Sequence, residues 1–151
     1  MDFKIRKIQQ SDKPELLDMM TIFYNSPAVL TNANRDILNR DIDDCISDMP
    51  FVEGFVFVNN TNQIAGYAMI AKSYSTEFGG LCIWIEDLYI KPDYRHMGLS
   101  KIFFDFIEDL YKDKAVRFRL EVEYENENAC KAYNKAGLKE LPYVQMTKEF
   151  I

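Results

Sequence analysis

One stretch in the middle of the chain combines a strand, a tight loop and a helix with almost no spacing between them. Residues 81–90 are dense in β-branched and aromatic side chains, as in a strand. Pro92 and Asp93 end this strand, and Gly98 lets the next loop approach a ligand closely. Residues 99–112 then follow a helical pattern that predicts a helix covering a sheet. Its apolar positions are Leu99, Ile102, Phe103, Phe106 and Leu110.

The loop between this strand and this helix suits a phosphate group. The first amides of a helix have no intrahelical partner and lie at the positive end of the helix dipole. A phosphate or pyrophosphate placed there would accept several hydrogen bonds together. Strand-to-helix turns with one glycine are also common as purely structural features, so the loop alone leaves both interpretations open.

A second pattern lies downstream, in residues 126–138. It begins at Asn126, a preferred residue before the first turn of a helix, and closes at Gly137, a preferred residue after the last turn. These signals predict a short helix over residues 126–136.

The two patterns together resemble those of the GNAT superfamily of acetyl-CoA-dependent N-acetyltransferases. The first is similar to the family's pyrophosphate loop, Arg/Gln-x-x-Gly-x-Gly/Ala, with Arg95, Gly98 and Ser100 in the defining places. Ser100 departs from the usual glycine or alanine, and its side chain either crowds the pyrophosphate or donates a hydrogen bond. The second is similar to Asn-x-x-Ala-x-x-x-Tyr-x-x-x-Gly, through Asn126, Ala129, Tyr133 and Gly137.

The resemblance implies an α/β (α+β) fold, with a mixed, mostly antiparallel sheet of six to seven strands, about four helices and splayed central strands. Residue patterns predict strands near 3–8, 55–58, 64–71, 81–90 and 116–122, with 138–141 and 144–150 closing the sheet. Two more helices are expected, one from 11–14 to about 25 and one over 35–49. The length of 151 residues favours a single domain, 1–151.

The family resemblance also implies acetyl-CoA as the acetyl-donor co-substrate. Its pantetheine arm would lie between the splayed strands, held by backbone groups of the central strand, with the pyrophosphate on the loop. The residues expected to bind it are Leu88, Tyr89, Ile90, Arg95, His96, Met97, Gly98, Leu99, Ser100, Lys101, Asn126, Ala129 and Tyr133.

Two side chains are candidates for the chemistry of amine acetylation. An acceptor amine is protonated at neutral pH and must lose a proton before it attacks. Glu86 is the candidate base, directly or through a water, and Tyr133 the candidate acid that protonates the departing thiolate. Asp87 competes as base or binds a cationic substrate, and both carboxylates share a pocket only if a β-bulge intervenes. Glu86 is favoured because it lies two and four residues before Leu88 and Ile90, and residues two apart on a strand point to the same side. In addition, Glu-Asp-Leu-Tyr-Ile resembles the diamine and polyamine acetyltransferase branch.

The acceptor pocket is expected from residues 24–35 and 74–80 and the central strand. Aromatic and acidic side chains there suit an alkylammonium group, although they can equally pack the loops. They are Tyr24, Tyr74, Glu77, Phe78, Trp84 and Asp87. The expected acceptor is a small primary amine, diamine- or polyamine-like or amino-acid-like. A protein N-terminus or lysine side chain is an alternative acceptor, and a non-catalytic acyl-CoA-binding regulatory module an alternative function.

Composition narrows the function classes further. The net charge of −6 argues against a general nucleic-acid binder, and no segment approaches the length of a membrane span. Three separated cysteines indicate reduced thiols in a cytoplasmic protein, and the single histidine, His96, argues against a metal site. Relatives of this kind often form homodimers.

Overall fold

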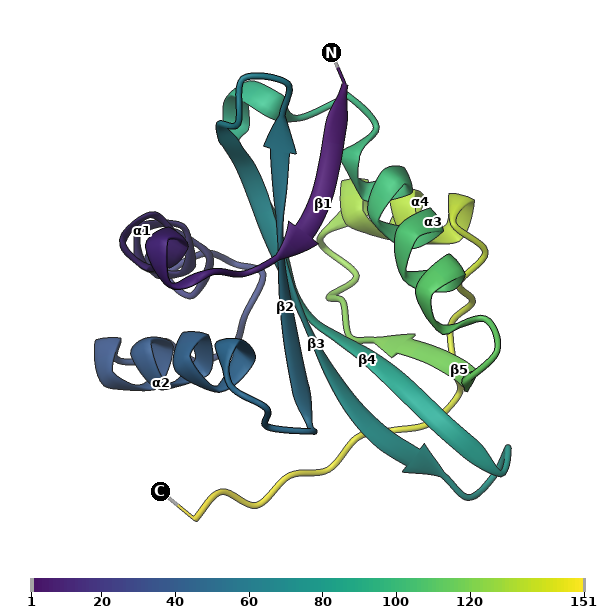
Figure 1. The fold of residues 1–151 in the computed structure, drawn as a ribbon. Coiled ribbons are helices and arrows are strands. Elements are labelled where there is room, and N and C mark those ends of the chain that lie inside the picture. The colour runs from purple at the N-terminus through teal and green to yellow at the C-terminus, as the bar shows by residue number, and fades with distance from the viewer. Residues whose placement is uncertain (1, 151) are drawn as a thin grey trace.

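A computed structural model describes residues 2–150 as one five-stranded sheet with helices on both faces (Figure 1). The strands are β1 (Phe3–Lys7), β2 (Val52–Asn59), β3 (Ile64–Ser75), β4 (Gly80–Ile90) and β5 (Ala115–Leu120). The helices are α1 (Lys13–Phe23), α2 (Arg35–Ile46), α3 (Leu99–Tyr111) and α4 (Glu127–Lys135), with short 3₁₀ turns η1 (Gln10–Asp12) and η2 (Pro92–Tyr94). The α/β class, the hairpin of β2 and β3 and the central strand are confirmed.

The last strand of the sheet runs parallel to its neighbour, whereas all the other neighbouring strands are antiparallel. The strand order is β1-β2-β3-β4-β5, in which β1 to β4 are antiparallel neighbours and β5 runs parallel to β4. The ladder between β3 and β4 shifts register, because Met69 lies opposite Asp87 whereas the next residue, Ile70, lies opposite Ile85. Glu86 is therefore left outside the ladder, in a β-bulge.

Two hydrophobic cores lie on the two faces of this sheet. Alternate residues of β3 supply both: Tyr67 and Met69 pack under α1 and α2, while Ala68 and Ile70 pack under α3. Figure 1 shows α1 and α2 on one side of the sheet and α3 and α4 on the other. We call these the α1/α2 face and the α3/α4 face.

The predicted count of six to seven strands is wrong for the residues described, which form five. Residues 138–141 and 144–150 form no ladder. Their apolar side chains do not alternate onto a core, since Val144 is 89% and Met146 94% exposed, and Pro142 between the two segments has no N–H to donate. Helix α2 also ends earlier than predicted, at Ile46, because Ser47 is already extended. None of the helices over residues 2–150 is long and apolar enough to cross a membrane.

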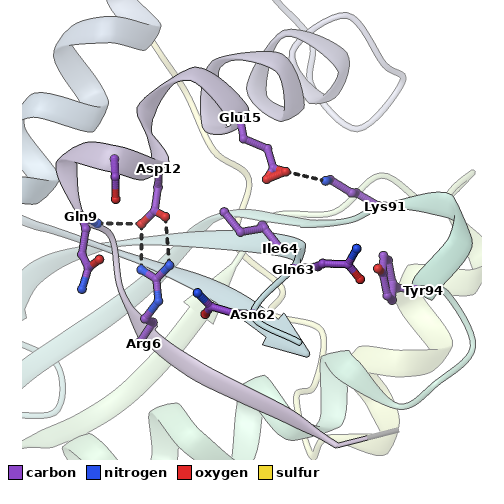
Figure 2. A pocket seen from close by; sticks show the side chains of 10 residues that line it. Arg6, Gln9, Asp12, Glu15, Asn62, Gln63, Ile64, Lys91 and Tyr94 are labelled. Carbon is purple, nitrogen blue, oxygen red and sulfur yellow. Dashed lines mark hydrogen bonds and ion pairs between the residues drawn. The ribbon is translucent and has the colours of Figure 1, made fainter. Parts of the chain in front are cut away.

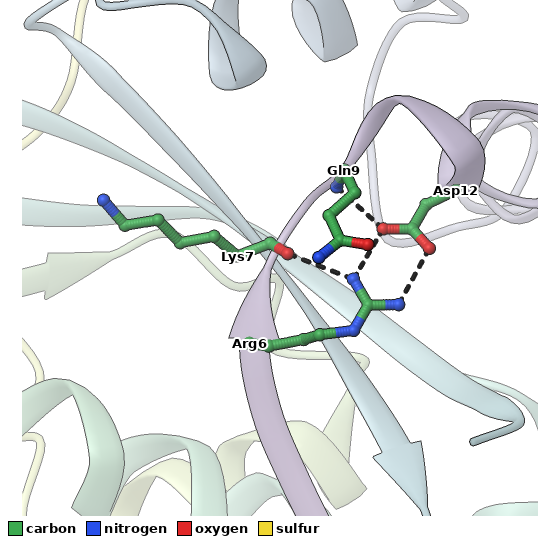
Figure 3. A network of polar contacts seen from close by, with 4 residues as sticks. All are labelled: Arg6, Lys7, Gln9 and Asp12. Carbon is green, nitrogen blue, oxygen red and sulfur yellow. Dashed lines mark hydrogen bonds and ion pairs between the residues drawn. The ribbon is translucent and has the colours of Figure 1, made fainter.

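A partly buried ion pair connects β1 to the start of α1 (Figure 3). The Arg6 guanidinium donates to both carboxylate oxygens of Asp12, at 2.8 and 2.9 Å, and the backbone amide of Gln9 donates to Asp12 at 2.8 Å. Asp12 is buried. Burial alone would raise its pKa, but the hydrogen bonds from Arg6 and Gln9 outweigh burial and lower it.

Asp12→Asn should therefore destabilise the protein at neutral pH by about 1–3 kcal/mol, because it leaves the charge of Arg6 without its partner. A lowered carboxyl pKa stabilises the fold above the unfolded pKa, near 4, and this contribution is lost as the pH falls through the folded pKa. The difference in the free energy of unfolding between variant and wild type, measured by urea unfolding, should thus become smaller in acid. Asp109→Asn, which breaks an exposed pair with Lys112, should leave the unfolding midpoint unchanged. Equal effects of the two substitutions would contradict the assignment.

Candidate active site

Strands β4 and β5 part at the middle of β4. Their pairing ends with Ile85 opposite Leu120, although β4 continues to Ile90. Residues 86–90 therefore have no strand neighbour on this edge among the residues described. An unpaired strand edge of this kind accepts an added extended chain through backbone hydrogen bonds. The edge includes Leu88, Tyr89 and Ile90, the strand residues expected to bind the pantetheine arm.

The loop after β4 leads into the N-terminus of α3 through two left-handed residues. His96 has a φ of 63° and Gly98 a φ of 79°. The first intrahelical bond runs from the Ile102 amide to the Gly98 carbonyl, so the amides of residues 99–101 remain unpaired within the helix. Ser100 is the second residue of α3, and no acidic residue occupies the first turn. These features leave the N-terminus of α3, the positive end of its helix dipole, available to an anion.

Arg95 is held at the start of this loop. Its Nε donates to the carbonyl of Ile90 at 3.0 Å, and its guanidinium lies 5.9 Å from the ring centre of Tyr89. The side chain therefore packs along the end of β4, with its charge beside the unpaired edge.

Helix α4 supplies the second predicted pattern. The Asn126 side chain accepts a hydrogen bond from the Ala129 amide at 3.4 Å, and Gly137, with a φ of 92°, follows the helix. Tyr133 packs edge-on against Phe104 on the α3/α4 face, with ring centres 5.8 Å apart. Burial raises the pKa of Tyr133, and its hydroxyl has no hydrogen-bond partner in residues 2–150. The phenol therefore stays protonated at neutral pH.

The bulge separates the environments of the two adjacent carboxylates. Asp87 is 1% exposed and accepts hydrogen bonds from the hydroxyls of Tyr24 at 2.7 Å and Tyr67 at 2.9 Å. Burial raises the pKa of Asp87 to about 7, against the opposing effect of the two hydroxyls. Both oxygens of Asp87 are occupied, so it is poorly placed to bind a substrate directly.

Glu86, in contrast, is exposed and makes no ion pair with the residues described. Desolvation raises its pKa, and the charges of Glu121 and Asp41 raise it further. These neighbours come from the segment after β5 and from α2. The carboxylate with the freer oxygens thus lies where β4 and β5 part.

The other residues of the expected acceptor pocket fall into separate groups. Glu77 accepts from Arg117 at 2.9 Å and from the Tyr143 hydroxyl at 2.8 Å. Arg117 also lies 4.7 Å from the ring centre of Phe78. Tyr74 pairs with Leu81, which packs on the α3/α4 face, so the structure does not bring Tyr74 beside Trp84.

Three charged residues near the bulge escaped the sequence analysis: Asp41, Arg119 and Glu121. Trp84 packs against one of them, with the Arg119 guanidinium 4.4 Å from its ring centre. The alternation Arg-Phe-Arg-Leu-Glu over 117–121 was a usable signal, because residues two apart on a strand share a face. No local pattern marks Asp41, which reaches the site only through the packing of α2.

A polar cavity lies away from this site, between β1, the start of α1, the β2–β3 turn and the end of β4 (Figure 2). It measures about 470 Å³, and its charged side chains are already paired. Arg6 pairs with Asp12, and Lys91 with Glu15 at 3.2 Å. We regard this polar cavity as part of the junction between β1 and α1.

Comparison with known proteins decides the family. The acetyltransferase (GNAT) family model matches residues 16–138. The chain belongs to the GNAT family. It is 34% identical over 99 residues to a thialysine N-epsilon-acetyltransferase of Caenorhabditis elegans, covering 64% of this chain and 57% of the relative. A Bos taurus protein of the same name is 33% identical over 79 residues, 52% of this chain and 46% of the relative. This GNAT chain thus spans about half the length of the curated relatives it matches.

Solved structures support the same fold for this GNAT chain. A possible acetyltransferase from Clostridium difficile 630 has a TM-score of 0.84 at 21% identity, with 99% of this chain and 98% of that chain covered. The aminoglycoside N-acetyltransferase AAC(6')-Iy, in complex with CoA, has a TM-score of 0.80 at 12% identity, with 99% and 96% covered. At these identities the likeness concerns the fold alone.

The hydrogen bonds around Asp87 predict how its carboxyl group titrates. Carbon-13 NMR should show a midpoint near pH 7, the region where its pKa lies. Tyr67→Phe removes one donor to the ionised carboxylate and should raise this midpoint by about one pH unit. Tyr89→Phe is the control, because its ring lies 6.2 Å from that of Tyr67 but its hydroxyl does not contact Asp87. If the Tyr67 substitution leaves the midpoint in place, the hydrogen bond is not formed in solution.

Proposed function

We propose that this protein transfers the acetyl group of acetyl-CoA directly to a primary amine, with Glu86 as general base and Tyr133 as general acid. The observation that carries the proposal is the bulge, which leaves Glu86 outside the β3–β4 ladder at the point where β4 and β5 part. Family membership supports acetyl-CoA as the donor. The unpaired edge of β4 and the open N-terminus of α3 fit its pantetheine arm and pyrophosphate.

The residues divide the proton transfers between them. Acetyl-CoA supplies an activated acetyl group as a thioester. Glu86 accepts a proton from the ammonium group, so that the amine nitrogen forms the new C–N bond to the acetyl carbon as the C–S bond breaks. Tyr133 gives a proton to the departing sulfur, and the second proton that the nitrogen loses as the amide forms restores the phenol, so that the net proton released is the one held by Glu86. The raised pKa of Glu86 suits the first step, because a stronger base takes a proton from an ammonium group more readily.

The acceptor proposed is a small amine that is cationic in solution. The charges of Asp41 and Glu121 both act on Glu86, and this group of carboxylates favours a positive group near the bulge. The relatives named thialysine N-epsilon-acetyltransferases support an acceptor with its amine at the end of a short chain. Asp87 is proposed as a residue that positions Tyr24, rather than as the base.

Glu86→Gln should lower the turnover number by about 10²- to 10⁴-fold, because the amide accepts no proton. The remaining rate should lose the rise with pH that reflects ionisation of Glu86, while the dissociation constant for acetyl-CoA stays close to that of wild type. Steady-state rates of thiol release across pH measure the first effect, and calorimetry the second. Glu108→Gln, on the exposed side of α3, is the matched control. A wild-type pH profile in the Glu86 variant would exclude this residue as the base.

Gly98→Val should abolish detectable acetyl-CoA binding, because a branched side chain at the start of α3 blocks the approach of the pyrophosphate. Gly79→Val is a matched control. Both glycines have positive φ, 79° and 72°, and neither would place a Cβ within 4 Å of other atoms. The two variants should lose similar stability in thermal unfolding, yet only the first should lose binding in calorimetry. Normal binding by a folded Gly98 variant would overturn the loop assignment.

A further inference from the structure

The C-terminal segment, residues 142–150, runs past β5 without joining the sheet (Figure 1). Two of its side chains attach it to the molecule. The hydroxyl of Tyr143 donates to Glu77, in the β3–β4 turn, at 2.8 Å. With its nitrogen turned toward Glu121, the orientation that satisfies both groups, the Gln145 amide donates to the two carboxylate oxygens at 3.1 and 3.2 Å. The segment is thus held at the β3–β4 turn and just beyond the end of β5.

The side chains of this segment alternate between the molecule and the solvent. Tyr143 and Gln145 are two residues apart, and in an extended chain such residues point to the same side. Val144 and Met146 point to the other side, and they are 89% and 94% exposed. The segment therefore turns its polar side chains toward the molecule, so two hydrogen-bonded contacts hold it there rather than burial of apolar surface.

The partner of Gln145 belongs to the surroundings of the proposed base. After desolvation, the charge of Glu121 is the strongest influence that raises the pKa of Glu86, and Asp41 from α2 adds to it. Glu86 in turn acts on Asp87 in β4 and on Tyr24 at the end of α1. All of these groups are acids. Because like charges repel, a Glu121 side chain without a restraint would turn away from Glu86 into solvent.

We propose that Gln145 is a positioning residue of the active site, which holds Glu121 beside Glu86 so that the two carboxylates receive the ammonium group of the acceptor together. The inference rests on the proposed function and adds the C-terminal segment to its site. An amide suits this role because it offers two N–H donors and no charge. A lysine or arginine at the same place would neutralise the carboxylate that the acceptor needs.

The titration of Glu86 in the free protein, followed by carbon-13 NMR of its carboxyl group, tests this placement without turnover. Glu121→Gln should lower the pKa of Glu86, because it removes a like charge. Gln145→Ala should lower it by less, because the released Glu121 keeps its charge but turns away. The double variant should match Glu121→Gln, since without the carboxylate Gln145 has nothing to hold. Met146→Ala, in the same segment but pointing into solvent, should keep the wild-type titration.

Two results would overturn the inference. A folded Gln145→Ala protein in which Glu86 titrates as in wild type would show that Gln145 does not hold Glu121. Shifts that simply add in the double variant would show that the two residues act on Glu86 independently.

Kinetics with L-lysine, thialysine and cadaverine as probe acceptors test the consequence for the reaction. Gln145→Ala should raise KM for the amine by about fivefold, the loss expected for one exposed ionic contact, and leave KM for acetyl-CoA unchanged. The acidic limb of its pH–rate profile should move to lower pH, as the Glu86 titration does, whereas Met146→Ala should change neither. Normal amine turnover with an unshifted Glu86 titration in the Gln145 variant would overturn this inference alone. No turnover of any amine, together with the shifted titration, would overturn the proposed reaction but support the placement of Glu121.

Discussion

The hydrogen bonds from Tyr24 and Tyr67 to the buried carboxylate of Asp87 join the end of α1, strand β3 and strand β4. A carboxylate inside a protein needs such partners, because burial without them is costly. Its position also fixes the register of β4. With Asp87 held on the α1/α2 face and Ile85 packed on the other, Glu86 has no place in the ladder and bulges out. The exposure of Glu86 is thus a consequence of the burial of its neighbour.

The parallel β5 provides the second constraint on the site. It follows β4 only as far as Ile85, and from there the two strands separate. Backbone groups left unpaired by this separation lie beside the bulged Glu86 and lead toward the N-terminus of α3. A donor bound along β4 and an acceptor held by side chains near Glu86 would therefore meet at one place. The separation of β4 from β5 and the one extra residue in the pairing of β4 with β3 account for the main features of the site.

The sequence predicted those parts of the protein that depend on local patterns. The helix start at Asn126, the strand–loop–helix unit around Gly98 and the hairpin of β2 and β3 are recorded in turn residues and hydrophobic periodicity. The sequence predicts the bulge at Glu86 only as the condition for both carboxylates to share a pocket. Its cause, the two tyrosine hydroxyls that donate to Asp87, is not local, because Tyr24 and Tyr67 lie 63 and 20 positions before Asp87 in the chain. Residues 144–150 show the opposite limit. Their apolar content favoured a strand, but no core receives their side chains.

The distribution of charge between the faces has a kinetic consequence. Asp41, Glu86, Glu121 and Arg119 gather toward the α1/α2 face, whereas Tyr133 and its neighbour Phe104 belong to the α3/α4 face. In the proposed reaction, the acceptor therefore reaches the place where β4 and β5 separate from the α1/α2 face, and the donor reaches it from the α3/α4 face. Neither molecule has to leave before the other enters or departs. Such a layout favours a ternary complex with no obligatory order of release.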